Sequence, residues 1–109
     1  MIAYISGPIT NDKNYKQKFA AAKNILEDRG LIVLNPATLP QGMPNDKYMP
    51  ICLQMLNAAD VLILLSGSET SQGTYIEYKF AKYQEKPIYS LNEFINICDG
   101  RADESEAQQ

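Results

Sequence analysis

The segment Asp60-Val-Leu-Ile-Leu-Leu65 holds the longest apolar run of the chain and decides the fold class. Its apolar residues do not alternate with polar ones, a pattern typical of a central parallel strand that is covered on both faces. The run is far too short to span a bilayer. A polar loop rich in Gly and Ser follows at 66–73, so the segment predicts a buried strand that ends in a polar loop.

Strand-like and helix-like segments alternate on both sides of this run. Short β-rich runs end at Gly, Pro or Asn, and apolar residues three and four positions apart mark the segments between them. The predicted strands cover residues 2–6, 31–34, 60–65 and 88–91, and the predicted helices cover residues 14–29, 47–58, 74–84 and 92–97. Gly30 is expected just past the first helix, and Asp46 is expected to cap the second.

This alternation implies a parallel sheet with helices on both faces. We therefore expect a single-domain Rossmann or flavodoxin-like three-layer α/β sandwich, with a four- to five-stranded parallel sheet, over residues 1–98. Residues 99–109 hold four acidic side chains, one Arg and no large apolar residue, so an acidic, disordered tail is expected there.

The composition excludes several classes of function. The chain has 109 residues, a net charge of -3 and two Cys. It has no His, which excludes catalytic sites of the Ser/His/Asp or Cys/His type and metal sites with His ligands. The acidic balance argues against binding to polymeric nucleic acid. Cys52 and Cys98 have neither disulfide-framework nor zinc-ribbon spacing. With no membrane segment and no basic leader, the sequence predicts a soluble cytoplasmic protein without metal or cofactor.

In parallel α/β sheets, ligands bind beyond the carboxyl ends of the strands. Here those ends are Ser6-Gly7-Pro8, Asn35-Pro36-Ala37 and the loop at 66–73. Gly7 directly follows the first strand, where the backbone can approach a ligand closely and free amides can meet an anion. A tight turn before the helix explains the same residues, and both interpretations stay open.

The segment Ser71-Gln-Gly-Thr-Tyr-Ile-Glu77 places hydroxyls, a glycine and a carboxylate at the expected start of a helix. Glu77 is expected in the first turn, where the helix dipole favours its ionised form and suits a carboxylate nucleophile. Thr74-x-x-Glu77 also matches a capping box, in which Glu77 only stabilises the helix.

Tyr4 lies inside the first predicted strand, where an aromatic ring usually just fills the core. Its buried hydroxyl still needs a partner, and the functional interpretation is that it lies near the strand ends and holds Glu77 by a hydrogen bond. Asp60 is interpreted as a helix-to-strand junction residue. Cys52 is interpreted as a small buried hydrophobic residue rather than a reactive thiol.

Four stretches, taken in order, resemble the nucleoside 2-deoxyribosyltransferase superfamily. They are Tyr4-Ile-Ser-Gly-Pro8, Asn35-Pro-Ala37, Ala59-Asp60 and Ser71-x-Gly-Thr-x-x-Glu77, and the resemblance covers residues 2–91. Within that superfamily the chain is most similar to a family of small, largely uncharacterised bacterial and phage proteins, whose pattern Tyr48-Met49 and Cys52-Leu53 also follow.

The resemblance implies a mechanism in which a glutamate attacks the anomeric carbon of a 2′-deoxyribosyl group and expels the base. A glycosyl-enzyme ester then remains until a second base or water resolves it. Glu77 matches the nucleophile, and Tyr4 matches the tyrosine that orients it. Ser71 and the amides around Gly7 and Gly73 match positions that hold a 5′-phosphate in nucleotide-acting relatives. The residues expected to bind substrate are Ser6, Gly7, Pro8, Asn35, Cys52, Ser71, Gly73 and Thr74.

At one position the sequence departs from the active relatives. They carry an aspartate on the helix before the third strand, where this chain has Cys52. A thiol of pKa about 8.5 protonates a departing base less readily than a tuned carboxylic acid. Two functions stay open: an enzyme, either a deoxyribosyltransferase or a deoxynucleoside 5′-monophosphate N-glycosidase, or a nucleotide-binding module with weak or no catalysis.

A third class, hydrolases of ADP-ribose-type or cytokinin-type nucleotides, shares the Gly-Thr-x-x-Glu helix start. That class also has a richer glycine loop and an Arg for which we find no counterpart here. In each case the expected ligand is a small nucleoside or nucleotide. The resemblance further implies a homodimer or larger homo-oligomer, because relatives often complete the pocket from a neighbouring subunit.

Overall fold

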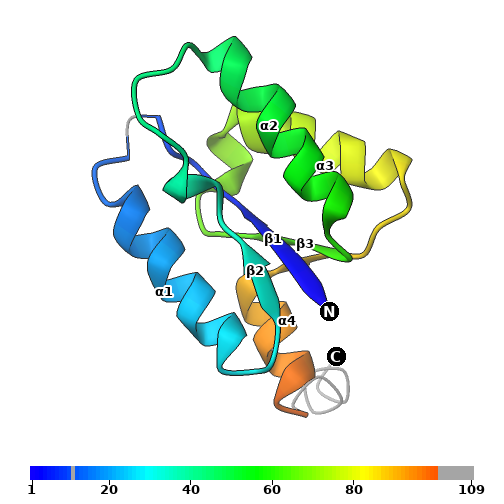
Figure 1. Ribbon diagram of the computed structural model, residues 1–109. Coiled ribbons are helices and arrows are strands. Elements are labelled where there is room, and N and C mark those ends of the chain that lie inside the picture. The colour runs from blue at the N-terminus through cyan, green and yellow to red at the C-terminus, as the bar shows by residue number, and fades with distance from the viewer. Residues whose placement is uncertain (11, 101–109) are drawn as a thin grey trace.

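In the computed structural model, which describes residues 1–10 and 12–100, four parallel strands form one sheet with helices on both faces (Figure 1). The strands are β1 (Ile2–Ser6), β2 (Ile32–Leu34), β3 (Val61–Leu64) and β4 (Ile88–Ser90). The helices are α1 (Tyr15–Glu27), α2 (Asn45–Ala58), α3 (Gln72–Tyr83) and α4 (Leu91–Cys98), with short 3-10 turns η1 (Pro36–Thr38) and η2 (Ser68–Thr70). The strand order β2-β1-β3-β4 confirms the predicted α/β class.

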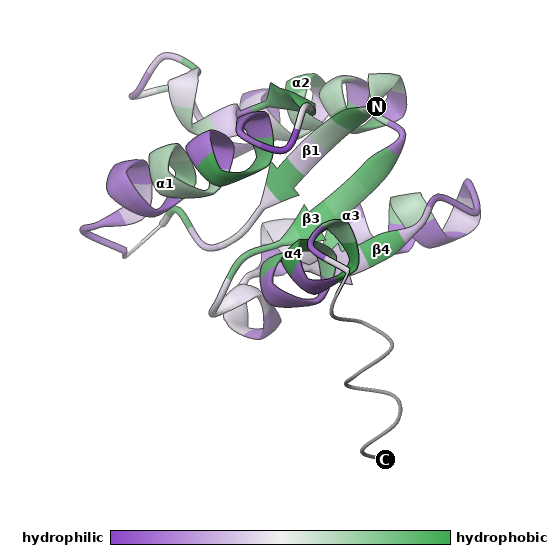
Figure 2. Ribbon diagram, turned by 90° about the horizontal axis from the view of Figure 1, so that it is seen from below, coloured by the Kyte–Doolittle hydropathy of each residue, from purple (hydrophilic) through white to green (hydrophobic). Residues whose placement is uncertain are grey.

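Different helices pack against the two faces of the sheet. Phe19 of α1 and Phe94 of α4 share one core cluster with Ile5 of β1. Leu56 of α2 belongs to the other cluster, together with Tyr4 of β1. Neighbouring residues of β1 serve different layers because successive strand side chains point to opposite faces. In Figure 2, β1 and β3 are coloured mainly as hydrophobic, whereas the helices around them carry both hydrophilic and hydrophobic residues.

Strand β1 lies inside the sheet and pairs with β2 on one side and β3 on the other. Its last residue, Ser6, is in register with Leu64, the last residue of β3. At the opposite end, the backbone N–H of Ile2 donates to Oδ2 of Asp60 at 2.7 Å. The prediction that Asp60 is a junction residue is therefore confirmed, and the carboxyl ends of the two central strands lie side by side.

The start of α2 differs from the prediction. The helix begins at Asn45 with Pro44 at the N-cap, so Asp46 lies in the first turn and the prediction of an Asp46 cap is wrong. Pro44 is extended, with φ -59° and ψ 149°, and no side chain caps the first amides. The negative charge of Asp46 still lies where the helix dipole stabilises it. Pro50, within the first two turns, is accommodated inside the helix.

Asp99, near the end of the described residues, is bonded to the turn that follows α1. Asp99, which the sequence analysis placed in the tail, accepts hydrogen bonds from Nε of Arg29 at 3.0 Å and from Nη2 at 2.8 Å. Residues 101–109, the remainder of the expected tail, lie outside the described residues. Among the helices of the described residues, none combines the length and the hydropathy needed to cross a membrane.

Candidate active site around Glu77

A carboxylate is buried between β1 and α3. The Tyr4 hydroxyl donates to Oε2 of Glu77 at 2.6 Å, and the Ser6 hydroxyl donates to Oε1 at 2.5 Å. Glu77 is only 6% exposed, and Tyr4 is fully buried. Both oxygens of the Glu77 carboxylate therefore have a hydroxyl partner on the central strand.

The positions of these side chains follow from the periodicities of a strand and a helix. Tyr4 and Ser6 are two residues apart, so they point to the same face of the sheet. Thr74 and Glu77 are three residues apart and share the buried face of α3. The Thr74 hydroxyl lies 2.9 Å from that of Ser6. Thus β1 and α3 each supply two polar side chains to one cluster.

The electrostatics of Glu77 are set by burial and by hydroxyls. Burial raises the pKa of Glu77, and the hydrogen bonds from Ser6 and Tyr4 oppose this rise. Among the described residues, no cation forms an ion pair with Glu77. Burial, followed by the charge of Glu77, also raises the pKa of Tyr4, so Tyr4 stays a protonated donor. The site therefore holds an acidic group whose charge no positive side chain of the described part of the chain neutralises.

Cys52 of α2 packs in the same core cluster as Tyr4. Its thiol is buried and not in a disulfide. Burial raises the pKa of Cys52, and the charge of Glu77 adds to the rise, while a hydrogen bond with Tyr4 opposes it. The thiol is therefore held in its neutral form, as expected for a small buried residue rather than a reactive nucleophile.

Helix α3 starts earlier than the sequence pattern predicts. It begins at Gln72, and the N-cap is Ser71, whose Oγ accepts from the backbone N–H of Thr74 at 3.2 Å. Glu77 consequently lies in the second turn, where it faces the sheet. The prediction of a Thr74–Glu77 capping box in the first turn is wrong, because Ser71 takes the extended conformation that a cap requires.

Gly7 and Pro8 form a loop that packs closely on the chain after β3. A Cβ on Gly7 would lie 3.0 Å from Cβ of Leu65, and a Cβ on Gly67 would lie 3.2 Å from Cγ of Pro8. Close packing therefore accounts for Gly7, which favours the tight-turn interpretation of this loop.

Gly73, in the first turn of α3, has no such packing reason. A Cβ there would meet Cε of Met49 at 3.6 Å and Oγ of Ser71 at 3.8 Å, both ordinary contact distances. Its φ is also not in the left-handed region. An added methyl group would fit against Met49 and Ser71, so packing within the protein does not explain a glycine at this position.

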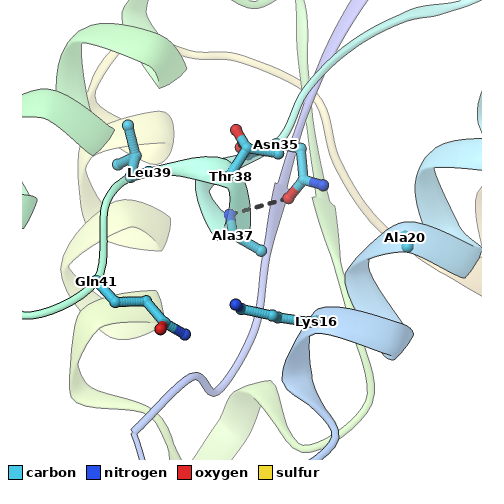
Figure 3. Close-up of a pocket in the computed structure, with 7 residues that line it drawn as sticks. All are labelled: Lys16, Ala20, Asn35, Ala37, Thr38, Leu39 and Gln41. Carbon is cyan, nitrogen blue, oxygen red and sulfur yellow. Dashed lines mark hydrogen bonds between the residues drawn. The ribbon is translucent and has the colours of Figure 1, made fainter.

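Asn35 lies on the other side of the sheet from Glu77. Its Oδ1 accepts from the backbone N–H of Ala37 at 2.9 Å and caps η1. Together with Lys16 and Ala20 of α1, it lines a hollow of about 420 Å³, in which the side chains of Lys16 and Gln41 extend toward each other (Figure 3). Lys16 and Gln41 could not be predicted from the sequence, since a single surface cation and a loop amide carry no pattern.

A second hollow, of about 400 Å³, lies beside β4 and is lined by residues such as Tyr78, Lys82 and Glu93. Glu77 lines neither hollow. In residues 1–10 and 12–100, no three His, Cys, Asp or Glu side chains are grouped so that they could hold a metal ion.

The structure thus brings together only part of the predicted site. Tyr4, Ser6, Thr74 and Glu77 form one hydrogen-bonded cluster, with Cys52 packed against it. Ser71 and Gly73 lie at the start of the helix that carries Glu77. The bonds of Ser6 and Thr74 to the cluster were missed, although two-residue and three-residue spacings from Tyr4 and Glu77 indicate a shared face.

Comparisons with known proteins place this geometry in a family and a fold. Among solved structures, four chains match. One is a 2-deoxyribosyltransferase from the psychrotolerant bacterium Bacillus psychrosaccharolyticus, with 19% sequence identity and a TM-score of 0.66 over 83% of this chain and 71% of that chain. No curated protein matches.

The identity is too low to carry more than the fold, but a family model matches most of the chain. That model describes a domain of unknown function, DUF4406, and matches residues 1–90, which include every residue of the Glu77 cluster. The chain therefore belongs to the DUF4406 family and has the fold of a nucleoside 2-deoxyribosyltransferase.

Proposed function

We propose that the protein cleaves the N-glycosidic bond of a deoxyribonucleoside or its 5′-monophosphate, with Glu77 as the nucleophile. The observation that carries this proposal is the buried Glu77 carboxylate, which two hydroxyls orient and which no cation among residues 1–10 and 12–100 neutralises. Displacement at a sugar C1′ passes through a transition state with positive charge on the ring. A buried, uncompensated carboxylate binds such a transition state more strongly than the neutral sugar.

In the proposed reaction, a Glu77 oxygen forms a bond to C1′ while the bond from C1′ to the base nitrogen breaks. The electron pair of that bond leaves with the base, which takes up a proton. The bond from C1′ to the Glu77 oxygen then breaks when a second base attacks C1′ through a nitrogen that loses its proton, or when water attacks and loses a proton. The first outcome is deoxyribosyl transfer and the second is hydrolysis, and Glu77 is regenerated in both.

Tyr4 is proposed to orient the nucleophile. It donates to Oε2 of Glu77 and remains protonated because its pKa is raised. A donor that cannot ionise near neutral pH holds the carboxylate in one rotamer without competing for the sugar. Ser71 and the amides around Gly73 are proposed to receive the 5′-phosphate, since Ser71 retains its hydroxyl proton after accepting from Thr74.

Protonation of the leaving base is the demanding step for this chain. The neutral Cys52 thiol, whose pKa is raised, is the residue at the position where active relatives carry an aspartate. A weak acid at this position supports slow turnover.

The test is to incubate the protein with a panel of deoxynucleosides and their 5′-monophosphates. Chromatography measures free base, and mass spectrometry of the intact protein detects the glycosyl ester. Release of base together with an adduct on Glu77 is the expected result. Tight nucleotide binding with no base and no adduct in any reaction would replace this proposal by a nucleotide-binding module.

A further inference from the structure

Two hydroxyls that the sequence analysis assigned to the substrate lie behind the Glu77 carboxylate. Ser6 is 1% exposed and Thr74 is 4% exposed. Oγ of Ser6 lies 2.5 Å from Oε1 of Glu77 and 2.9 Å from Oγ1 of Thr74. Both hydroxyls are therefore enclosed by β1 and α3 and are bonded within the protein.

The protons in this cluster can be assigned by counting donors. The Ser6 hydroxyl has one proton, and an ionised carboxylate can only accept. When Glu77 is ionised, the Ser6 proton is therefore donated to Oε1. The contact between the two hydroxyls must then use the proton of Thr74. The order of donation is Thr74 to Ser6 and Ser6 to Glu77.

The order of donation matters because no cationic side chain forms an ion pair with Glu77 in the part of the chain that the structure describes. Hydrogen bonds to a charged acceptor are stronger than those between neutral groups, and a donor that is itself an acceptor is strengthened further. Thr74 touches the carboxylate only through Ser6 in this network. Its effect on Glu77 should consequently depend on the Ser6 hydroxyl.

We propose that Ser6 and Thr74 are positioning residues, in which Thr74 donates to Ser6 and Ser6 donates to Oε1, so that the buried Glu77 carboxylate is held in one orientation and kept ionised. The contribution of this pair to catalysis rests on the proposed function. Its effect on the ionisation of Glu77 does not, because that ionisation is measurable without substrate.

The experiment titrates the Glu77 side chain in the full-length protein by carbon-13 NMR, with glutamate labelled at the side-chain carboxyl. Glu77→Gln identifies the signal by its disappearance. The variants are Ser6→Ala, Thr74→Val and the double variant. Thr74→Ser restores the hydroxyl, and Thr70→Val is the matched control, since the Thr70 hydroxyl bonds only the exposed carbonyl of Gly67.

Ser6→Ala is expected to lower the ionisation constant of Glu77 about tenfold, and Thr74→Val is expected to lower it about threefold. Thr74→Ser should return it to the wild-type value, and Thr70→Val should leave it unchanged. The double variant should equal Ser6→Ala alone, because Thr74 acts through Ser6. A double variant whose change is the sum of the two single changes overturns the relay, as does a Thr74→Val titration identical to that of the control.

A parallel measurement of base release separates this inference from the proposed function. If the wild type releases no base but the titrations follow the expected order, the proposed function fails and the positioning pair stands. If base is released while all variants titrate alike, the positioning pair fails. Should Ser6→Ala not fold, Thr74→Val and Thr74→Ser still decide, because the first keeps the shape of the side chain and loses the hydroxyl, whereas the second keeps the hydroxyl and loses the methyl group.

Discussion

The Tyr4 hydroxyl donates to Oε2 of Glu77 at 2.6 Å and joins two residues that are 73 positions apart in the chain. This bond links the central strand to the helix that follows β3, at the edge where the strands end. It gives the Glu77 carboxylate a fixed orientation in a buried environment that raises its pKa.

The raised pKa of Glu77 predicts that Glu77→Gln stabilises the protein near neutral pH. The folded-state pKa lies above the ordinary value of 4.5, so stability from this group is present below that value and is lost as the pH rises through the folded-state pKa. We expect a higher free energy of unfolding for Glu77→Gln than for the wild type at neutral pH. The gain should vanish in acid.

Urea unfolding of both proteins across the acidic to neutral range measures this difference. If Glu77 is the nucleophile, base release is abolished in the same variant, while nucleotide affinity stays within a few fold. A variant that is less stable than wild type at neutral pH would contradict the sign, and undiminished base release would refute the mechanism.

Cys52→Asp is predicted to accelerate base release. It places a second carboxyl group in the cluster of Tyr4 and Glu77, and two neighbouring carboxylates raise the pKa of one of them. The protonated partner can then serve as the acid that the neutral thiol supplies poorly, and general acid catalysis is worth roughly a hundredfold or more. We expect faster release with an acidic pH optimum.

The matched control is Cys52→Asn, which has the same shape and no titratable proton. Initial rates of base release against pH distinguish the two variants. Equal rates for Cys52→Asp and Cys52→Asn would contradict a role for proton donation at this position.

Alanine substitutions at Gly7 and Gly73 should have different effects on the stability of the protein. Gly7→Ala brings a Cβ to 3.0 Å from that of Leu65, so we expect a loss of about 1–3 kcal/mol in the free energy of unfolding. Gly73→Ala meets only ordinary contacts in a helix, and should be neutral or stabilising by up to about 1 kcal/mol. Thermal unfolding measures both values.

If the Gly73 backbone faces the phosphate, Gly73→Ala should weaken nucleotide binding in calorimetry, although the variant is at least as stable as the wild type. Unchanged affinity for Gly73→Ala would move the phosphate site away from the start of α3.

A deoxynucleoside 5′-monophosphate is predicted to bind more tightly than its nucleoside, through Ser71 and the first amides of α3. Ser71→Asp provides a sharp test, because Asp caps a helix as well as Ser does but repels a phosphate. We expect at least a tenfold loss of nucleotide affinity, an unchanged nucleoside affinity and an unchanged melting temperature. Calorimetry that finds equal affinity for nucleoside and nucleotide in the wild type would contradict the phosphate site.

Self-association is predicted through the exposed face of α3. Tyr75, Ile76 and Tyr83 of this helix are 61%, 46% and 86% exposed, which is unusual for large apolar side chains on one helix. Ile76→Asp should shift the protein toward monomer in sedimentation velocity at micromolar concentration. Ile32→Asp, at an apolar residue on β2 that is 63% exposed, is the control that should not. A monomeric wild type would contradict the prediction.

The order of strands and helices was predictable because the apolar residues of each element recur with the spacing of a strand or a helix, or because Gly, Pro or Asn marks its end. The apolar run before Leu65 predicts a buried parallel strand, and the apolar positions of α1 predict an amphipathic helix. The ends were harder to place. Ser71 and Thr74 both suit an N-cap by residue type, and the choice depends on a backbone conformation that the sequence pattern does not reveal.

The hydrogen bond between Tyr4 and Glu77 was predictable because a buried tyrosine hydroxyl requires an acceptor. The bonds of the small hydroxyls were harder to predict. A buried Tyr4 hydroxyl requires an acceptor, and Glu77 was expected to provide it. The bonds of Ser6 and Thr74 could not be assigned in advance, because a small hydroxyl satisfies itself equally well with backbone, water or ligand. The hollow beside Asn35 depends on how α1 and the loop after β2 pack together, which no local pattern encodes.

The position of the Glu77 cluster also has a consequence for biosynthesis. Strand β1 leaves the ribosome before α3, and Tyr4 and Ser6 have no acceptor for their hydroxyls until Glu77 of α3 has been made. A nascent chain that stops after β3 would bury these two hydroxyls without their acceptor or leave β1 undocked. Closure of the cluster is thus a late event of folding, and a chain becomes competent for chemistry only when its first strand and its third helix have met.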